Sequence, residues 1–180
     1  MKWLIASDIH GSAYWCRRLL DAFRAEGADR LLLLGDILYH GPRNALPEAY
    51  APMEVAGMLN EFRNVTVSLR GNCEAEIDQM VLEFPAMAEH ALIDLGKRIV
   101  FATHGHVYNE RNIPPLGEGG VLLHGHTHVP VCEQRENYIL MNPGSVSIPK
   151  NGSPHGYMTL DNGLFVWKDL NGGEYMRLSL

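Results

Sequence analysis

The sequence predicts an α/β (α+β) fold in which two mixed β-sheets pack as a sandwich flanked by helices. Apolar strands alternate with amphipathic helices from residue 2 to residue 72, a pattern typical of parallel strands joined by crossover helices. After residue 90 the pattern changes to short strands separated by turn signals, which indicates antiparallel pairing. The 180 residues contain no linker or repeat, so one domain is expected over 1–180.

Three strands and two helices are expected in the first half. The strands are expected over 2–7, 30–34 and 65–69. A first helix is expected over 14–26, because apolar residues recur there at intervals of four and Gly27 marks its end. Residues 39–52 are rich in Gly, Pro, Arg and Asn and predict a loop. Pro52 suits the first turn of a second helix.

The second half is expected to consist of hairpins and short strands. A hairpin is expected over 91–102, with its turn near Gly96-Lys97. The further strands are expected near 121–123, 129–133, 138–142, 156–160 and 164–168. The segment Asp161-Asn162-Gly163 between the last two is a strong signal for a tight hairpin turn.

The composition excludes several classes of protein. Hydrophobic residues make up 46% and charged residues 20%, which argues against a disordered or fibrous chain. The net charge of −6 argues against a broad nucleic-acid-binding surface. Three widely spaced cysteines argue against a disulfide framework and favour a cytoplasmic location. No apolar run is long enough to predict a membrane-spanning helix.

Polar residues that can bind metals follow five of the expected strands. These clusters are Asp8-Ile9-His10, Gly35-Asp36, Gly71-Asn72, His104-Gly105-His106 and Gly125-His126-Thr127-His128. Asp, Asn and His suit hard or borderline divalent metals, and ligands of open α/β sheets bind at the carboxyl ends of strands. Each cluster alone is typical of an ordinary turn or surface residue. All five together, each at a strand end, predict a metal site.

The order of these motifs resembles the calcineurin-like metallophosphoesterases, and in particular the small YfcE-type phosphodiesterases. The shared pattern is D-x-H, then G-D, then G-N-[H/C]-[D/E], then H, then G-H-x-H, and it runs nearly the length of the chain. Three local stretches sharpen the resemblance to the YfcE type. They are His40 to Pro47, Arg70 to Cys73 and Asn142 to Ser147.

The resemblance implies two divalent metal ions held by seven side chains. The first ion would be bound by Asp8, His10, Asp36 and His128. The second would be bound by Asp36, Asn72, His104 and His126. Asp36 would bridge the two ions, because a shared carboxylate helps hold two cations about 3.5–4 Å apart. Mn²⁺ is the expected metal, and the donor set also suits Fe, Co, Ni and Zn.

The implied activity is hydrolysis of a small phosphodiester by a metal-bridging hydroxide, with Asp36 and Asn72 in the reacting centre. Arg43 is expected to contact the phosphate because its loop follows Asp36; the ordinary alternative is a solvated loop arginine. Cys73 stands where many relatives have a His that is thought to protonate the leaving oxygen. A thiol is a weak donor, so activated aryl or diester substrates should react better than alkyl monoesters. Glu74 replaces the more usual Asp.

Other functions remain open at this stage. One is a scaffold or protein-interaction module like the retromer subunit of similar fold, which has lost part of its metal ligation. All seven ligand positions here hold Asp, Asn or His, which favours an enzyme. A nucleotide-specific diesterase would share the same chemistry and differ only in the shape of its pocket. The sequence leaves a homo-oligomer open as well.

Overall fold

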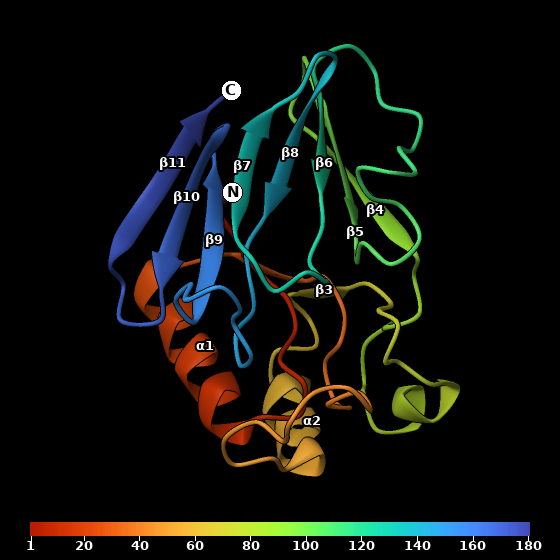
Figure 1. Ribbon diagram of the computed structural model, residues 1–180. Helices are drawn as coiled ribbons and strands as arrows, with labels where there is room; N and C mark the ends of the chain where they lie inside the picture. The colour runs from red at the N-terminus through yellow and green to blue at the C-terminus, as the bar shows by residue number, and fades with distance from the viewer.

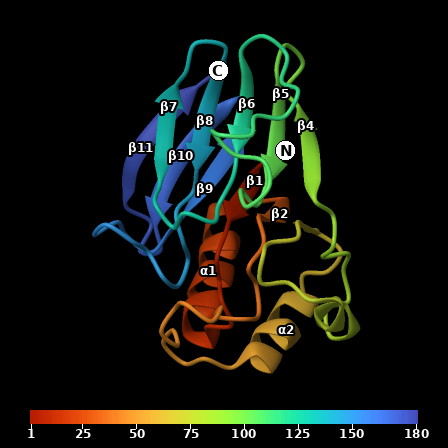
Figure 2. The same ribbon diagram turned by 45° about the vertical axis from the view of Figure 1, so that its right-hand side comes forward.

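The computed structural model describes all residues from 1 to 180, and it consists of two β-sheets packed face to face (Figures 1 and 2). The six-stranded sheet has the order β11-β10-β9-β1-β2-β3. Its strands are β1 (Trp3–Ala6), β2 (Arg30–Leu33), β3 (Thr66–Ser68), β9 (Gly156–Asp161), β10 (Leu164–Asp169) and β11 (Glu174–Ser179). The pairs β1–β2 and β2–β3 are parallel, whereas β9 runs antiparallel to β1.

The five-stranded sheet has the order β4-β5-β6-β8-β7. Its strands are β4 (His90–Asp94), β5 (Ile99–Thr103), β6 (Gly120–Leu123), β7 (Val131–Gln134) and β8 (Tyr138–Asn142). The three central strands, β5, β6 and β8, are parallel, and the two edge strands are antiparallel to their neighbours. Both sheets are therefore mixed, as the sequence predicts.

Helices α1 (Ala13–Glu26) and α2 (Pro52–Asn60) complete the architecture together with a short 3₁₀ helix, η1 (Glu76–Met80). Ser12 caps α1, because its hydroxyl oxygen accepts a hydrogen bond from the backbone N–H of Trp15. Gly27 ends α1 in a left-handed conformation, with φ of 60°, as expected for a helix C-terminus. Pro52 opens α2, in agreement with the sequence. No helix is both long and apolar enough to cross a membrane.

The core forms two layers because successive residues of a strand point to opposite faces of its sheet. Leu4 and Leu31 belong to the layer that contains the buried faces of α1 and α2. Ile5 and Leu32 belong to the layer between the two sheets, where they pack with residues such as Val121. Both helices thus lie on the six-stranded sheet, near the lower end of the view in Figure 2.

The predicted hairpins form. Strands β4 and β5 pair with Ile93 opposite Val100, and β9 and β10 pair with Asp161 opposite Leu164. The predicted strand over 129–133 begins later, at Val131, because Pro130 has no backbone N–H to donate. Strand β11 and the helix η1 were not expected from the sequence. The helix η1 is short, and β11 is an edge strand that pairs only with β10.

Candidate metal centre

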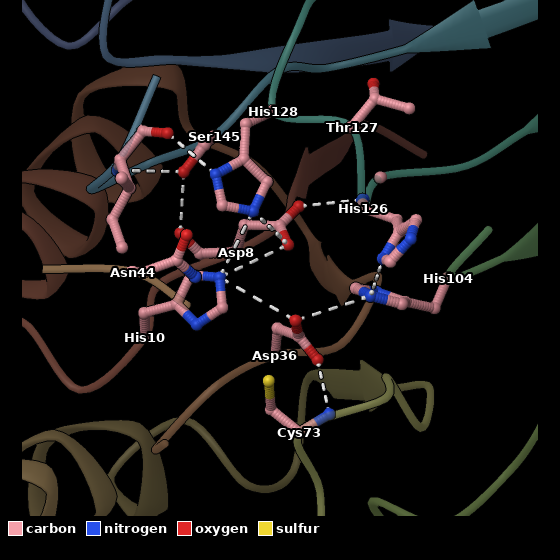
Figure 3. A network of polar contacts seen from close by, with 12 residues as sticks. Asp8, His10, Asp36, Asn44, Cys73, His104, His126, Thr127, His128 and Ser145 are labelled. Atoms are coloured by element: carbon pink, nitrogen blue, oxygen red, sulfur yellow. Dashed lines mark hydrogen bonds and ion pairs between the residues drawn. The ribbon is translucent and has the colours of Figure 1, made fainter. Parts of the chain in front are cut away.

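The candidate metal ligands lie in the loops that follow five parallel strands. The loop after β1 carries Asp8 and His10, the loop after β2 carries Asp36, the segment after β3 carries Asn72, the loop after β5 carries His104, and the loop after β6 carries His126 and His128. These loops come from both sheets, and their side chains converge on one centre. In Figure 3, Asp36 lies between the pair of rings from His10 and His128 and the pair from His104 and His126.

The first group of donor atoms surrounds the carboxylate of Asp8. Its Oδ1 lies 3.5 Å from Nε2 of His10 and 3.2 Å from Nε2 of His128. The two ring nitrogens are 3.3 Å apart. Oδ2 of Asp36 lies 3.7 Å from Nε2 of His10. Four donor atoms from three loops are therefore close enough to bind one cation.

The second group surrounds Nε2 of His104. That nitrogen lies 3.1 Å from Oδ1 of Asn72 and 3.3 Å from Nδ1 of His126. It also lies 3.5 Å from Oδ2 of Asp36. The same carboxylate oxygen of Asp36 thus faces both groups, which is the arrangement that a bridging ligand requires.

Hydrogen bonds on the far side of three rings fix which nitrogen carries the proton. Nδ1 of His10 donates to the carbonyl of Tyr39 over 2.8 Å. Nδ1 of His104 donates to Leu34 O, and Nδ1 of His128 donates to Ile148 O, each over 2.7 Å. In a neutral ring this leaves a lone pair on Nε2, which points into the centre.

These lone pairs fit a bound cation. Nε2 of His10 and Nε2 of His128 face one another at 3.3 Å with no proton between them in their neutral forms. Oδ1 of Asp8, which lies beside both, is buried and has no hydrogen-bond partner. A cation at this position would remove the repulsion and satisfy the carboxylate. The donor set is all nitrogen and oxygen, which suits a divalent transition metal.

The backbone of the candidate ligands is strained. Five of them adopt the left-handed conformation, with φ between 49° and 65°. They are Asp8, His10, Asp36, His126 and His128. Each such residue costs about 1–2 kcal/mol relative to a right-handed conformation. Strain of this kind concentrates at functional sites, where the surrounding structure holds side chains in a required direction.

The charges of the centre agree with a ligand role for both carboxylates. Burial acts to raise the pKa of Asp8, but the nearby rings of His10 and His128 lower it well below its usual range. The pKa of Asp36 is lowered in the same way, with His104 as its partner. Burial likewise opposes protonation of His104, yet the carboxylate of Asp36 raises its pKa to about 9, so without a cation its Nε2 carries a proton that a bound metal would displace. Both aspartates are therefore ionised at neutral pH.

Glu74 fastens together two of the ligand loops. Its Oε1 accepts a hydrogen bond from the backbone N–H of Ile37 over 2.6 Å, and its Oε2 accepts one from Asp36 N–H over 2.9 Å. Oε2 also accepts from the N–H of Gly71. Burial and the charge of Asp36 raise the pKa of Glu74, while the backbone hydrogen bonds oppose that rise. This glutamate thus holds the Asp36 loop against the segment that carries Asn72.

Two glycines allow the loops to approach so closely. A Cβ on Gly71 would lie 2.2 Å from Oδ1 of Asp36. A Cβ on Gly125 would lie 1.9 Å from Oγ of Ser7 and 2.8 Å from Oδ2 of Asp8. Such distances are shorter than van der Waals contact, so only glycine fits at either position without a shift of the backbone.

The centre opens into a cleft of about 460 Å³. Arg43, Cys73 and Lys150 line this cleft together with the candidate ligands Asp36 and His126. Arg43 is exposed and therefore free to reach a substrate. Lys150 was not expected from the sequence, because it lies far along the chain from Asp36 and just outside the motif that ends at Ser147. A larger cavity of about 1050 Å³ lies beside the β4–β5 hairpin and contains none of the candidate ligands.

Three other histidines lie near the centre without joining either donor group. His106 is exposed and lines a small neighbouring cavity with Asn72. His124 is buried, and its Nε2 lies 3.7 Å from a carboxylate oxygen of Glu110. The ring of His40 packs edge-on against the rings of its neighbours Tyr39 and Tyr50.

Residues 1–163 match the family model of the calcineurin-like phosphoesterase superfamily domain, which covers every candidate ligand. The chain belongs to this superfamily. The prediction of an enzyme that hydrolyses phosphate esters is confirmed at this level, and divalent metals are the cofactors that the metallophosphoesterase superfamily implies.

Individual members of the superfamily that are similar to this chain support the same assignment. The chain is 52% identical over 162 residues to "Phosphodiesterase YfcE" of Escherichia coli strain K12, covering 90% of this chain and 88% of that protein. The solved structure of Yfce, a phosphoesterase from E. coli, superposes with a TM-score of 0.95 at 47% identity, covering 99% of each chain. The predicted fold and the resemblance to the YfcE type are confirmed.

More distant solved structures share only the fold. Vacuolar protein sorting 29 from Cryptosporidium parvum superposes with a TM-score of 0.61 at 16% identity, covering 99% of this chain and 98% of that chain. Its similarity supports the arrangement of the two sheets and carries no information about the activity of the present chain.

Proposed function

We propose that this protein is a dinuclear metal-dependent phosphodiesterase that hydrolyses small phosphodiesters. The observation that carries the proposal is the position of Asp36 Oδ2, which lies 3.7 Å from His10 Nε2 and 3.5 Å from His104 Nε2. One carboxylate oxygen therefore faces both donor groups. The 52% identity to a protein named as a phosphodiesterase supports the same substrate class.

Two divalent ions, with Mn²⁺ as the expected metal, would supply Lewis acidity. They would also lower the pKa of a water molecule enough to give a hydroxide nucleophile near neutral pH. Asp8, His10 and His128 would hold the first ion with Asp36. Asn72, His104 and His126 would hold the second ion with the same aspartate. The amide oxygen of Asn72 is neutral, so the centre keeps net positive charge for the phosphate.

The residues of the cleft would bind and orient the phosphate. Arg43 and Lys150 both line the cleft and can donate charge-assisted hydrogen bonds to phosphate oxygens. Burial and the nearby carboxylate of Asp36 raise the pKa of Cys73, so its side chain stays a thiol at neutral pH. A thiol donates weakly to a leaving oxygen, which favours esters whose alcohols leave without full protonation. We also propose a cytoplasmic location, because all three cysteines are free.

The test compares metal-stripped and Mn²⁺-loaded protein on an aryl phosphodiester and on the matching monoester. We expect metal-dependent hydrolysis that is faster for the diester. We also expect Asp36→Asn to lower kcat/KM by about 100-fold or more, because the bridging carboxylate is lost. Asp21→Asn is the matched control, since Asp21 lies on the surface of α1 and pairs only with Arg24. It should leave the rate unchanged.

Two readouts do not depend on turnover. Metal analysis should give two ions per chain for the native protein and fewer for Asp36→Asn. At 100 times its dissociation constant, each bound ion adds about 2.7 kcal/mol to the free energy of unfolding. For a chain of this size, that corresponds to a rise in Tm of roughly 5–11 °C. A folded protein that binds no metal, or that hydrolyses the diester equally well without it, would overturn the proposal.

A further inference from the structure

An apolar groove lies next to the metal centre, on the far side of Cys73. Its volume is about 370 Å³. One wall is formed by Tyr39, from the loop after β2, and by Met53, from the first turn of α2. Ile77, in η1, also lines the groove. Asp78 is the only charged residue that lines the groove. Nothing in the proposed mechanism uses these side chains.

The groove adjoins the cleft of the metal centre at Cys73. This residue lines both the groove and the cleft that holds the candidate ligands. Its backbone N–H donates a hydrogen bond to Oδ1 of Asp36 over 2.9 Å, as Figure 3 shows. A group that extends from a phosphate in the cleft past Cys73 would therefore reach the groove.

A second link ties the groove to the centre. The carbonyl of Tyr39 accepts the hydrogen bond from Nδ1 of His10. The side chain of the same tyrosine lines the groove. The wall of the groove and the orientation of a candidate metal ligand thus depend on one short segment, which fixes the groove relative to the reacting centre.

The side chains of the groove are unusually exposed for their type. Met53 is 65% exposed, Ile77 is 64% exposed and Tyr39 is 42% exposed. Contiguous exposed apolar surface commonly marks a site that binds a ligand or partner. Because this surface adjoins the cleft of a phosphoesterase at Cys73, the occupant that fits is a part of the substrate.

We propose that this groove binds an apolar leaving group of the phosphodiester, such as a substituted aryl alcohol. The inference rests on the proposed function and deepens it by naming the substrate class. The single charge of the groove is the carboxylate of Asp78, which disfavours anionic leaving groups such as nucleotides. Hydrolysis would break the P–O bond to the alcohol, while water supplies an oxygen to phosphorus and a proton to the alcohol.

The test uses two Mn²⁺-dependent substrates that differ only in apolar size, phenyl methyl phosphate and 4-butylphenyl methyl phosphate. Their leaving phenols have nearly equal acidity, so the intrinsic chemistry is matched. The readout is the ratio of the two kcat/KM values. We expect the native protein to prefer the butylphenyl ester by about tenfold, because added methylenes gain affinity in an apolar pocket.

The double variant Met53→Ser/Ile77→Ser should reduce this preference to less than about twofold, since it removes two apolar side chains that line the groove. The matched control is Leu92→Ser/Ile113→Ser, which changes two other exposed apolar side chains, outside the groove and the cleft. This control should keep the native preference. All four positions are exposed, so both double variants should fold, and circular dichroism with a thermal melt checks that they do.

The outcomes separate the two proposals. Hydrolysis of both esters with equal kcat/KM by the native protein would overturn the groove inference and leave the phosphodiesterase proposal standing. Hydrolysis of neither ester, nor of the aryl diester used above, would overturn both. An unchanged preference in the groove variant, accompanied by a lower mass in sedimentation velocity, would assign the groove to contact between copies of the chain and would also overturn the inference.

Discussion

Glu74 illustrates how much of the metal centre depends on a residue that binds no metal. The residue is 5% exposed, and its carboxylate accepts hydrogen bonds from the backbone N–H groups of Asp36, Ile37 and Gly71. A carboxylate can accept all three because it has only acceptors. An aspartate at this position is one methylene shorter, so it could not reach the same groups from the same backbone. The departure from the usual family pattern is therefore a change in how two loops are joined.

We expect Glu74→Gln to lower the free energy of unfolding by about 1–3 kcal/mol. The amide NH₂ of glutamine would face a backbone N–H, so at least one buried hydrogen bond would be lost. It should also lower kcat, because the loop that aims Asp36 would shift. Urea denaturation and steady-state kinetics measure both effects.

The control for that substitution is Glu76→Gln, which changes an exposed glutamate two residues further along. Surface changes of this kind usually alter stability by less than about 0.5 kcal/mol. Equal effects of the two substitutions would contradict the role assigned to Glu74.

At the scale of elements, the centre depends on strand ends and on the turns that keep strands in register. Strands β9 and β10 are joined by Asn162 and Gly163, with φ of 48° and 80°. Positive φ at both central residues is typical of the tightest hairpin turn, and Asn-Gly is its preferred sequence. Strand β9 pairs with β1, whose end carries Asp8. The turn thus supports the sheet that presents the first candidate ligand, although it does not line the cleft.

We expect Gly163→Val to lower Tm by roughly 2–8 °C. A β-branched residue in the left-handed conformation costs about 1–2 kcal/mol of stability. The activity of the folded enzyme at low temperature should not change. Gly57→Ala is the matched control: Gly57 lies inside α2, and a Cβ there meets no atom within 4 Å. Alanine should raise stability by roughly 0.5–1 kcal/mol. A fall in Tm for both variants would contradict this account.

At the scale of the whole molecule, Glu26 joins the end of α1 to the six-stranded sheet. It accepts hydrogen bonds from Tyr157 in β9 and Lys168 in β10, at 2.9 Å and 2.6 Å, and from Lys2 before β1 at 2.6 Å. Burial would raise the pKa of Glu26, but the hydrogen bonds from Lys168, Lys2 and Tyr157 lower it to about 2. One carboxylate therefore links the helix layer to the six-stranded sheet.

The lowered pKa predicts a pH dependence of stability. Since the folded pKa of about 2 lies below the ordinary value of 4.5, the unfolded chain binds a proton more readily. The contribution of Glu26 should be complete above pH 4.5 and should disappear as the pH falls towards 2. Glu26→Gln should cost about 1.5–3 kcal/mol at pH 7.

The measurement is the difference in the free energy of unfolding between the native protein and Glu26→Gln across that pH range. Other carboxylates also titrate there, so the difference between the two proteins isolates the contribution of Glu26. Asp21→Asn, which removes an exposed carboxylate from the same helix, should show no such change with pH. A difference that stays constant from pH 7 to pH 3 would argue against the assigned role of Glu26.

The sequence by itself determined the features that depend on short stretches of chain. The periodicity of α1, the Asn-Gly turn and the apolar strands are local, and so are the motifs that name the candidate ligands. Their spacing also predicted that the ligands follow strands of one α/β fold. The residues alone did not indicate that the ligands form two groups around Asp36. That expectation came only from the resemblance to a known family.

The tertiary structure decided the features that depend on contacts between distant residues. Glu74 lies 38 positions from Asp36 in the chain, and no local pattern indicates that its carboxylate meets that backbone. Lys150 and Arg43 line one cleft although more than 100 residues separate them. Cys73 lines both the cleft and the apolar groove, because segments that are distant in the sequence pack around it. Such contacts arise when whole sheets and helices pack, and the amino-acid order encodes them only through the complete fold.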